Sequence, residues 1–387
     1  MKDKFLSIPP EKITIDTHRQ HPDISLERYV RSKSLSTADK VLARKAIYLD
    51  TRYWILLREV VLGRSTDTVL PKTLSQLRSL VAAGTVICPI NADILSELLK
   101  QNDQMTRLAM ARLIDDLSLG AALQSEDERI GTELMHCVRR TQHGQEALEP
   151  LERLVWTSPS YVLGYVFPTT DLFSDEENLA CQKAFTDYLW DFPLADAVSM
   201  LPPLPAEMTV RWNAIADKLN YEIKQHDLQA QPFVKLHVDE FKGALDGYLT
   251  TLTNIFGYLY EKQTGVAPPK EGRVHFEEAA RGLIEILGEA LRTGKLGKQV
   301  PSLAIKAGLH AGFRRNRGRQ FSGNDLYDFG HATAALAYCD YFATDKRLRH
   351  LVVNDLKFDE RYDATVVSDP SEFLQLLRRI CERSACK

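Results

Sequence analysis

The sequence predicts an α/β fold with a central parallel sheet that a large helical insertion interrupts. Near both ends of the chain, short apolar runs alternate with amphipathic helical segments, whereas the middle has helical patterning alone. Such alternation is typical of parallel strands joined by crossover helices. The predicted parts are an N-terminal arm (1–40), the first half of the core (41–120), the helical insertion (121–312) and the second half of the core (313–387).

The first half of the core has the pattern strand, helix, helix, strand, helix. Gly63 and Gly84 are expected to end the first two helices, because glycine suits the backbone conformation that follows a helix. Asn91 is a favoured residue at the N-cap of the third helix. The predicted elements are a strand at 47–49, helices at 52–62 and 72–83, a strand at 85–89 and a helix at 92–101.

The α/β pattern returns near the other end of the chain, after a middle that proline-rich stretches break into helices. Trp156, Trp190 and Trp212 give this middle an apolar content of its own, which favours a packed segment over a disordered linker. The elements predicted after it are a helix at 328–339, a strand at 341–344, a short helix after Asp345, a strand at 365–367 and a helix at 370–382.

Composition limits the classes of function. The net charge of −3 provides no global attraction for nucleic acid, so any such contact must come from a local basic patch. The six cysteines are scattered without a Cys-x-x-Cys pair, which indicates reduced thiols and not a disulfide framework or a zinc site. No apolar run has the length of a membrane span. We therefore expect a soluble, cytoplasmic protein with no membrane partner.

Two acidic residues stand out in the first half of the core. Asp50 closes the first strand, and ligands of open parallel sheets bind at the carboxyl ends of strands; a simple helix cap is the alternative. Glu97 lies in the apolar stripe of its predicted helix, beside Ile94 and Leu98. Because a buried carboxylate needs a cation or several donors, Glu97 indicates either a metal ligand or a buried salt bridge.

A second acidic group lies in the other half of the core. Asp325, Asp328 and His331 recur every three residues at the start of a helix, where the helix dipole alone would also favour the two carboxylates. Asp340 and Asp345 bracket the predicted strand at 341–344, which puts Asp345 at a strand end like Asp50. A turn explains Asp340 equally well.

Strand-end and first-turn acids of a parallel sheet are expected to converge on one rim, where their charges repel one another. A hard divalent cation with oxygen ligands, Mg²⁺ or Mn²⁺, cancels that repulsion. Such ions activate water and neutralise charge on a phosphodiester. The acids therefore predict metal-dependent phosphodiester hydrolysis, in which Asp325 and Asp328 compete for one position.

The order of the motifs LDT (49–51), SELL (96–99), NDLYD (324–328) and ATD (343–345) resembles that of the PIN-domain nucleases. The resemblance implies an α/β/α sandwich with a central parallel sheet, and an endonuclease that cleaves mostly single-stranded RNA with Mg²⁺ or Mn²⁺. It covers about 41–120 and 321–370. Compact members have a short connection where this chain has its insertion.

The resemblance also assigns roles to residues. Asp50, Glu97, Asp328 and Asp345 match the four catalytic acids, and Asp328 is preferred to Asp325 for its spacing to Thr344. All five acids are candidate metal ligands, and the residues expected to support them are Thr344, which matches the family's hydroxyl residue, His331 and Asp340.

Four arginines precede the third acid and are predicted to contact phosphates; a solvated loop is the alternative. They are Arg314, Arg315, Arg317 and Arg319. The rival to an active nuclease is a catalytically silent PIN-like module that binds nucleic acid or serves as a protein scaffold. Retention of all four acids favours activity. The choice between RNA and DNA, an inhibitory partner and the oligomeric state stay open.

Overall fold

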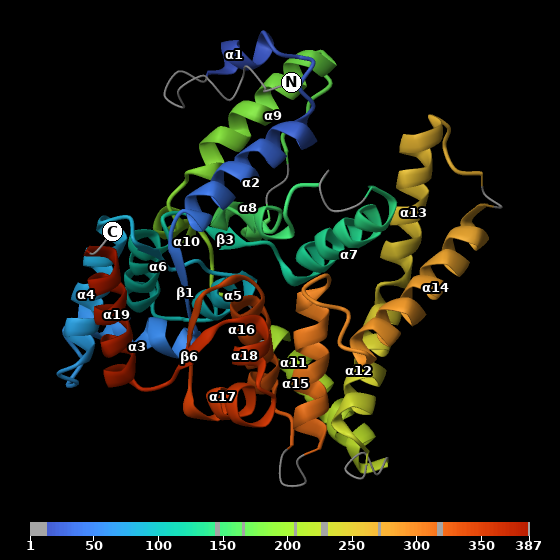
Figure 1. Ribbon diagram of the computed structural model, residues 1–387. Helices are drawn as coiled ribbons and strands as arrows, with labels where there is room; N and C mark the ends of the chain where they lie inside the picture. The colour runs from blue at the N-terminus through green and yellow to red at the C-terminus, as the bar shows by residue number, and fades with distance from the viewer. Residues whose placement is uncertain are drawn as a thin grey trace. The chain divides into compact units, whose positions relative to one another are not determined.

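The computed structural model describes residues 14–143, 148–164, 167–204, 207–225, 231–269, 272–315 and 320–385 (Figure 1). The chain divides into two compact units. Unit 1 comprises residues 1–125, 152–204 and 376–387, and unit 2 comprises residues 126–151 and 205–375. Segments of the predicted insertion at 121–312 are found in both units.

Unit 1 contains the first predicted strand-and-helix pattern. β1 and β2 pair in parallel, with Lys45 opposite Val86 and Ala46 opposite Ile87. The predicted strands and helices are confirmed to within a few residues, because their apolar periodicity matches the side chains that are buried. The elements are α1 (Ile15–Arg19), α2 (Leu26–Leu42), β1 (Lys45–Leu49), α3 (Thr51–Val61), α4 (Leu70–Ala82), β2 (Val86–Ile87), α5 (Ala92–Leu99) and α6 (Gln104–Ser118).

Two parts of unit 1 differ from the prediction. The predicted arm contains α2, which packs against β1 and α9, while residues 1–13 lie outside the described residues. The predicted all-helical middle contains an antiparallel pair, β3 with β4. Leu119 and Gly120, with φ of 51° and 71°, end α6 in the left-handed region and redirect the chain into β3. The elements are β3 (Ala122–Leu123), β4 (Trp156–Thr157), α8 (Pro159–Leu163), α9 (Asp175–Trp190) and α10 (Leu194–Met200).

Unit 2 contains a group of long helices with a shared apolar core. Leu134, Phe241, Leu252, Leu287 and Leu303 are buried in it, contributed by five different helices. α13 and α14 lie side by side as a helical hairpin (Figure 1). The helices are α7 (Glu126–His143), α11 (Glu207–Gln225), α12 (Phe233–Gly247), α13 (Leu249–Thr264), α14 (Gly272–Arg292) and α15 (Pro301–Arg314).

The second strand-and-helix pattern also lies in unit 2, where β5 and β6 pair in parallel from Tyr341 and Thr365 onward. The predicted strands and helices are confirmed, although the first helix begins earlier, at Gly323. Among the described helices, none is long and apolar enough to cross a bilayer. The elements are α16 (Gly323–Tyr338), β5 (Tyr341–Ala343), α17 (Lys346–Arg349), the π-helix η5 (His350–Asp355), α18 (Phe358–Tyr362), β6 (Thr365–Val367) and α19 (Pro370–Ala385).

Candidate functional site

Asp50 joins the buried strand β1 to the helix α3. Its Oδ1 accepts the Tyr53 backbone N–H at 3.1 Å, so Asp50 is the N-cap of α3. The residue is only 5% exposed. This hydrogen bond orients the carboxylate, whose two oxygens are acceptors. Asp50 therefore combines a structural role with the oxygen chemistry that a hard cation requires.

Glu97 lies close to the beginning of α3. The Thr51 hydroxyl donates a hydrogen bond to Glu97 Oε2, so unit 1 brings the residue after Asp50 into contact with the second predicted acid. Asn91 caps α5 as expected, with its Oδ1 accepting the Ile94 N–H at 3.1 Å. Glu97 is half-buried, at the edge of the apolar stripe that contains Ile94 and Leu98.

Lys100 follows Glu97 on the same surface of unit 1. Burial lowers the pKa of the Lys100 ammonium, and the negative charges of Glu97 and Asp93 oppose that shift. The Lys100 ammonium therefore interacts electrostatically with the carboxylates of Glu97 and Asp93. Lys100 was not predicted from the sequence.

Asp345 repeats in unit 2 the arrangement of Asp50. It follows β5 and caps α17, with Oδ1 accepting the N–H groups of Arg347 at 2.6 Å and Leu348 at 2.8 Å. The preceding Thr344 is fully buried, and its Oγ1 has no hydrogen-bond partner among the residues that the structure describes. A buried hydroxyl without a partner costs free energy.

Asp325 is already compensated within unit 2. Its Oδ2 accepts the Ser322 N–H at 2.8 Å, completing a capping box at the start of α16. Its Oδ1 forms an ion pair with Arg347 at 2.9 Å. Sequence analysis missed Arg347, although the basic residues directly after Asp345 are visible in the sequence. The structure gives Asp325 the helix-cap role that the dipole argument allowed.

The other predicted residues of unit 2 lie on or beside α16. Asp328 is half-buried on this helix and His331 is buried. Asp340 is half-buried just before β5, and its carbonyl oxygen accepts the Thr365 N–H at 3.0 Å. Asp340 therefore adjoins the start of the β5–β6 pair.

The candidate acids are divided between the units, with Asp50 and Glu97 in unit 1 and the others in unit 2. Across the described part of the chain, no group of three or more histidine, cysteine, aspartate or glutamate side chains could hold a metal ion. The carboxylates at these positions supply the oxygen donors that Mg²⁺ and Mn²⁺ prefer.

The arginine segment is only partly described. Arg314 is 13% exposed on its side chain and forms ion pairs with Glu240 at 3.0 Å and Glu222 at 3.5 Å. Its charge also lowers the pKa of Glu240, which burial raises more strongly. Arg315 is exposed at the end of α15. Arg317 and Arg319 lie outside the described residues.

Comparison of the chain with protein-family models, with curated proteins and with solved structures gave no match.

Proposed function

We propose that the chain is a PIN-like, Mg²⁺- or Mn²⁺-dependent endonuclease that hydrolyses phosphodiester bonds of single-stranded RNA. One repeated arrangement supports the proposal. In each unit, a strand of a parallel pair ends at an aspartate that caps the next helix, Asp50 after β1 and Asp345 after β5. Carboxyl ends of parallel strands are the usual place for ligand binding in α/β folds.

The residues of unit 1 suit a weakly chelating magnesium site. Mg²⁺ keeps several waters and is held by one or two carboxylates together with substrate phosphates. Asp50 and Glu97 provide two such carboxylates, and a set of three is not required. When bound, the ion would activate water and offset charge on the phosphoryl oxygens.

The protein itself would hold these carboxylates in position. The Tyr53 N–H orients Asp50, and the Thr51 hydroxyl orients Glu97. In unit 2 the N–H groups at the start of α17 orient Asp345. The buried Thr344 lies directly before Asp345 and supports the end of β5. Preorganised groups of this kind lose little conformational freedom when substrate binds.

The test uses Asp50→Asn and Asp345→Asn. Asparagine is as good an N-cap as aspartate, so each change removes a negative charge while the helix cap is kept. We expect cleavage of a single-stranded RNA in Mn²⁺ to fall by roughly 100-fold or more in both variants, since weaker outer-shell changes already cost about 10–100-fold. Thermal melting should change little.

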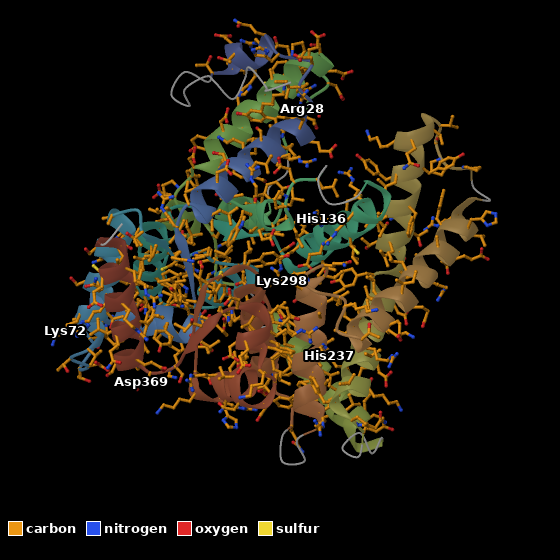
Figure 2. All side chains as sticks on the ribbon, viewed as in Figure 1. Arg28, Lys72, His136, His237, Lys298 and Asp369 are labelled. Atoms are coloured by element: carbon orange, nitrogen blue, oxygen red, sulfur yellow. The ribbon has the colours of Figure 1, made fainter. Side chains whose placement is uncertain are left out.

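Two matched controls separate charge at the candidate site from charge at any helix cap. Asp103 caps α6 through the Thr106 N–H at 2.8 Å. Asp369, labelled in Figure 2, accepts the Ser371 N–H at 2.9 Å at the start of α19. Asp103→Asn and Asp369→Asn should retain full activity. Cleavage that persists in chelator, or in Asp50→Asn, would contradict the proposal.

The silent PIN-like module remains the second candidate, because Asp325, the competitor for the third acidic position, is already paired with Arg347. It would be favoured if the wild-type chain bound single-stranded RNA but released no product with Mg²⁺ or Mn²⁺.

A further inference from the structure

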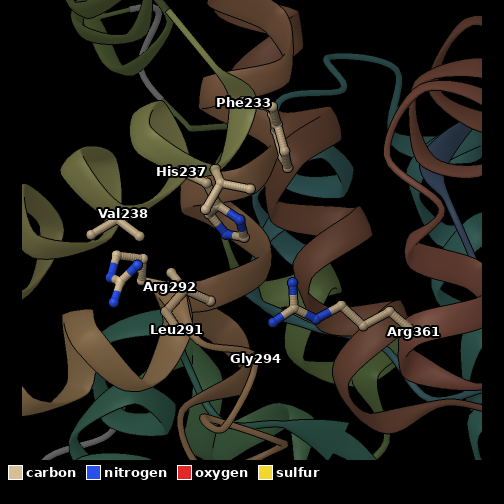
Figure 3. Close-up of a pocket in the computed structure, with 8 residues that line it drawn as sticks. Phe233, His237, Val238, Leu291, Arg292, Gly294 and Arg361 are labelled. Atoms are coloured by element: carbon tan, nitrogen blue, oxygen red, sulfur yellow. The ribbon is translucent and has the colours of Figure 1, made fainter.

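A pocket of about 290 Å³ opens in unit 2 among α12, the end of α14 and α18 (Figure 3). None of its lining residues belongs to the acidic positions discussed above. Its apolar lining includes Phe233, Val238 and Leu291, and Figure 3 shows His237 between Phe233 and the other two. Its polar groups are two arginines and a histidine. The lining is therefore mixed, with apolar groups that can pack against a ligand and a few polar groups that can orient it.

Arg361 supplies an uncommitted positive charge. It is exposed on α18, and no carboxylate among the described residues forms an ion pair with it. The guanidinium lies over the Tyr362 ring, 5.6 Å from its centroid, and Figure 3 shows it directed toward His237. A guanidinium with unused donors pairs well with phosphate.

His237 supplies a hydrogen-bond acceptor. It is 3% exposed, and its Nε2 lies 2.7 Å from the Ala304 carbonyl oxygen. Since a carbonyl oxygen can only accept, Nε2 carries the proton. Burial lowers the pKa of His237 to about 4, and the positive charge of Arg361 also lowers it. The ring is therefore neutral at pH 7, and Nδ1 presents a lone pair, which calls for an N–H or O–H on a ligand.

Arg292 adds a second cation to the pocket. Its guanidinium is held by Glu289 through bonds of 2.6 and 2.7 Å, so it contributes less charge than Arg361. Figure 3 shows the Arg292 guanidinium beside Val238, on the opposite side of His237 from the Arg361 guanidinium, so Arg361 is the cation that lies where a bound phosphate could pair with it. A phosphate monoester carries about −1.5 to −2 at pH 7. The Phe233 ring, 5.3 Å from the His237 ring, provides a partly exposed aromatic face.

We propose that this pocket binds a small phosphate monoester with a planar ring that carries an N–H donor, of the size of a nucleoside monophosphate. The phosphate pairs with Arg361. The ring packs against Phe233 and Leu291 and donates to His237 Nδ1. The assignment does not depend on nuclease activity, because it uses none of the candidate acids.

The experiment measures binding by calorimetry to the full chain, without divalent metal. The probes are uridine 5′-monophosphate, uridine and inorganic phosphate. We expect the monophosphate to bind at least about tenfold more tightly than either part alone, since ring and phosphate occupy separate parts of the pocket. Arg361→Gln should weaken monophosphate binding by about tenfold or more, the effect of losing one charge-assisted pair.

Two further variants make the test specific. Val238→Trp should fill the pocket and abolish binding. Arg281→Gln is the control variant. Arg281 lies on α14, as Arg292 does, and forms an ion pair with Glu277, but it does not line the pocket. The affinity of Arg281→Gln for the monophosphate should equal that of wild type. Far-UV circular dichroism checks that each variant is folded. The proposal is overturned if the monophosphate does not bind, if phosphate alone binds as tightly, or if Arg281→Gln weakens binding as much as Arg361→Gln.

Discussion

At the scale of single residues, Asp325 has contacts that determine what its substitution should cost. Asp325 closes a capping box and pairs with Arg347, whose side chain is 53% exposed. Asp325→Asn keeps an oxygen that can accept the Ser322 N–H but removes the charge that pairs with Arg347, so it should lower the stability of unit 2 by at most about 1 kcal/mol. Asp328→Asn should be the more damaging change for RNA cleavage. Urea unfolding measures the stability of both variants, and an RNA cleavage assay measures their activity. If Asp325→Asn lost more activity than Asp328→Asn, Asp325 would occupy the third acidic position.

The sequence predicts residues whose role depends only on their neighbours in the chain. Asp50, Asn91 and Asp345 could be predicted at strand ends and helix starts, because a cap depends only on its neighbours in the chain. The contacts of Thr51 with Glu97 and of Arg347 with Asp325 could not be predicted. Those contacts join residues that are distant in sequence or on different elements, and short motifs carry no information about such distances.

At the scale of elements, a buried polar group joins three helices of unit 2. Glu133 on α7 is fully buried and accepts hydrogen bonds from Ser302 on α15 and Tyr338 on α16. Burial raises the pKa of Glu133 to about 7, although these bonds and the charge of Arg129 lower it. The folded protein thus holds a proton that the unfolded chain releases near its ordinary pKa of 4.5.

The stability contributed by protonated Glu133 is therefore present below about pH 4.5 and is lost as the pH rises toward 7. A pKa difference of one unit corresponds to about 1.4 kcal/mol, so the full loss is on the order of 3 kcal/mol. Glu133→Gln should flatten the dependence of unfolding free energy on pH between 5 and 7. Glu277→Gln, on the exposed surface of α14, is the control. An unchanged pH slope in Glu133→Gln would contradict this assignment.

The helices and strands with strong periodicity were predictable, and the weak ones were not. β2 is as short as β3 and β4, but it lies in the apolar run after Gly84, whereas β3 and β4 lie in a stretch with helical patterning. Their pairing depends on tertiary contacts, which override local preference.

At the scale of the whole molecule, the residues of α19 are divided between the two units. Its residues up to 375 belong to unit 2 and those from 376 belong to unit 1, where Leu377 is fully buried. Leu377→Ala should cost about 2–5 kcal/mol of unfolding free energy, as large-to-small changes in a core do. Arg378→Ala, exposed on the same helix, should stay within about 0.5 kcal/mol. Urea unfolding measures both, and equal losses would show that the helix does not pack through Leu377.

The division into units could not be predicted from the sequence. Periodicity identifies the elements at 126–151 and 152–204 but not that they belong to different units. That assignment depends on which distant segments bury one another, which one sequence without related sequences does not reveal.

The order of segments in unit 1 has a consequence for synthesis on the ribosome. Residues 376–387 are made after about 170 residues that follow residue 204 and belong to unit 2, which takes on the order of 10–30 s at roughly 5–20 residues per second. Throughout that interval, the apolar surface that Leu376, Leu377 and Ile380 cover in the finished unit is open to solvent. Nascent chains of this protein should therefore expose an apolar surface to which chaperones can bind. In the completed chain, residues 376–387 cover that surface.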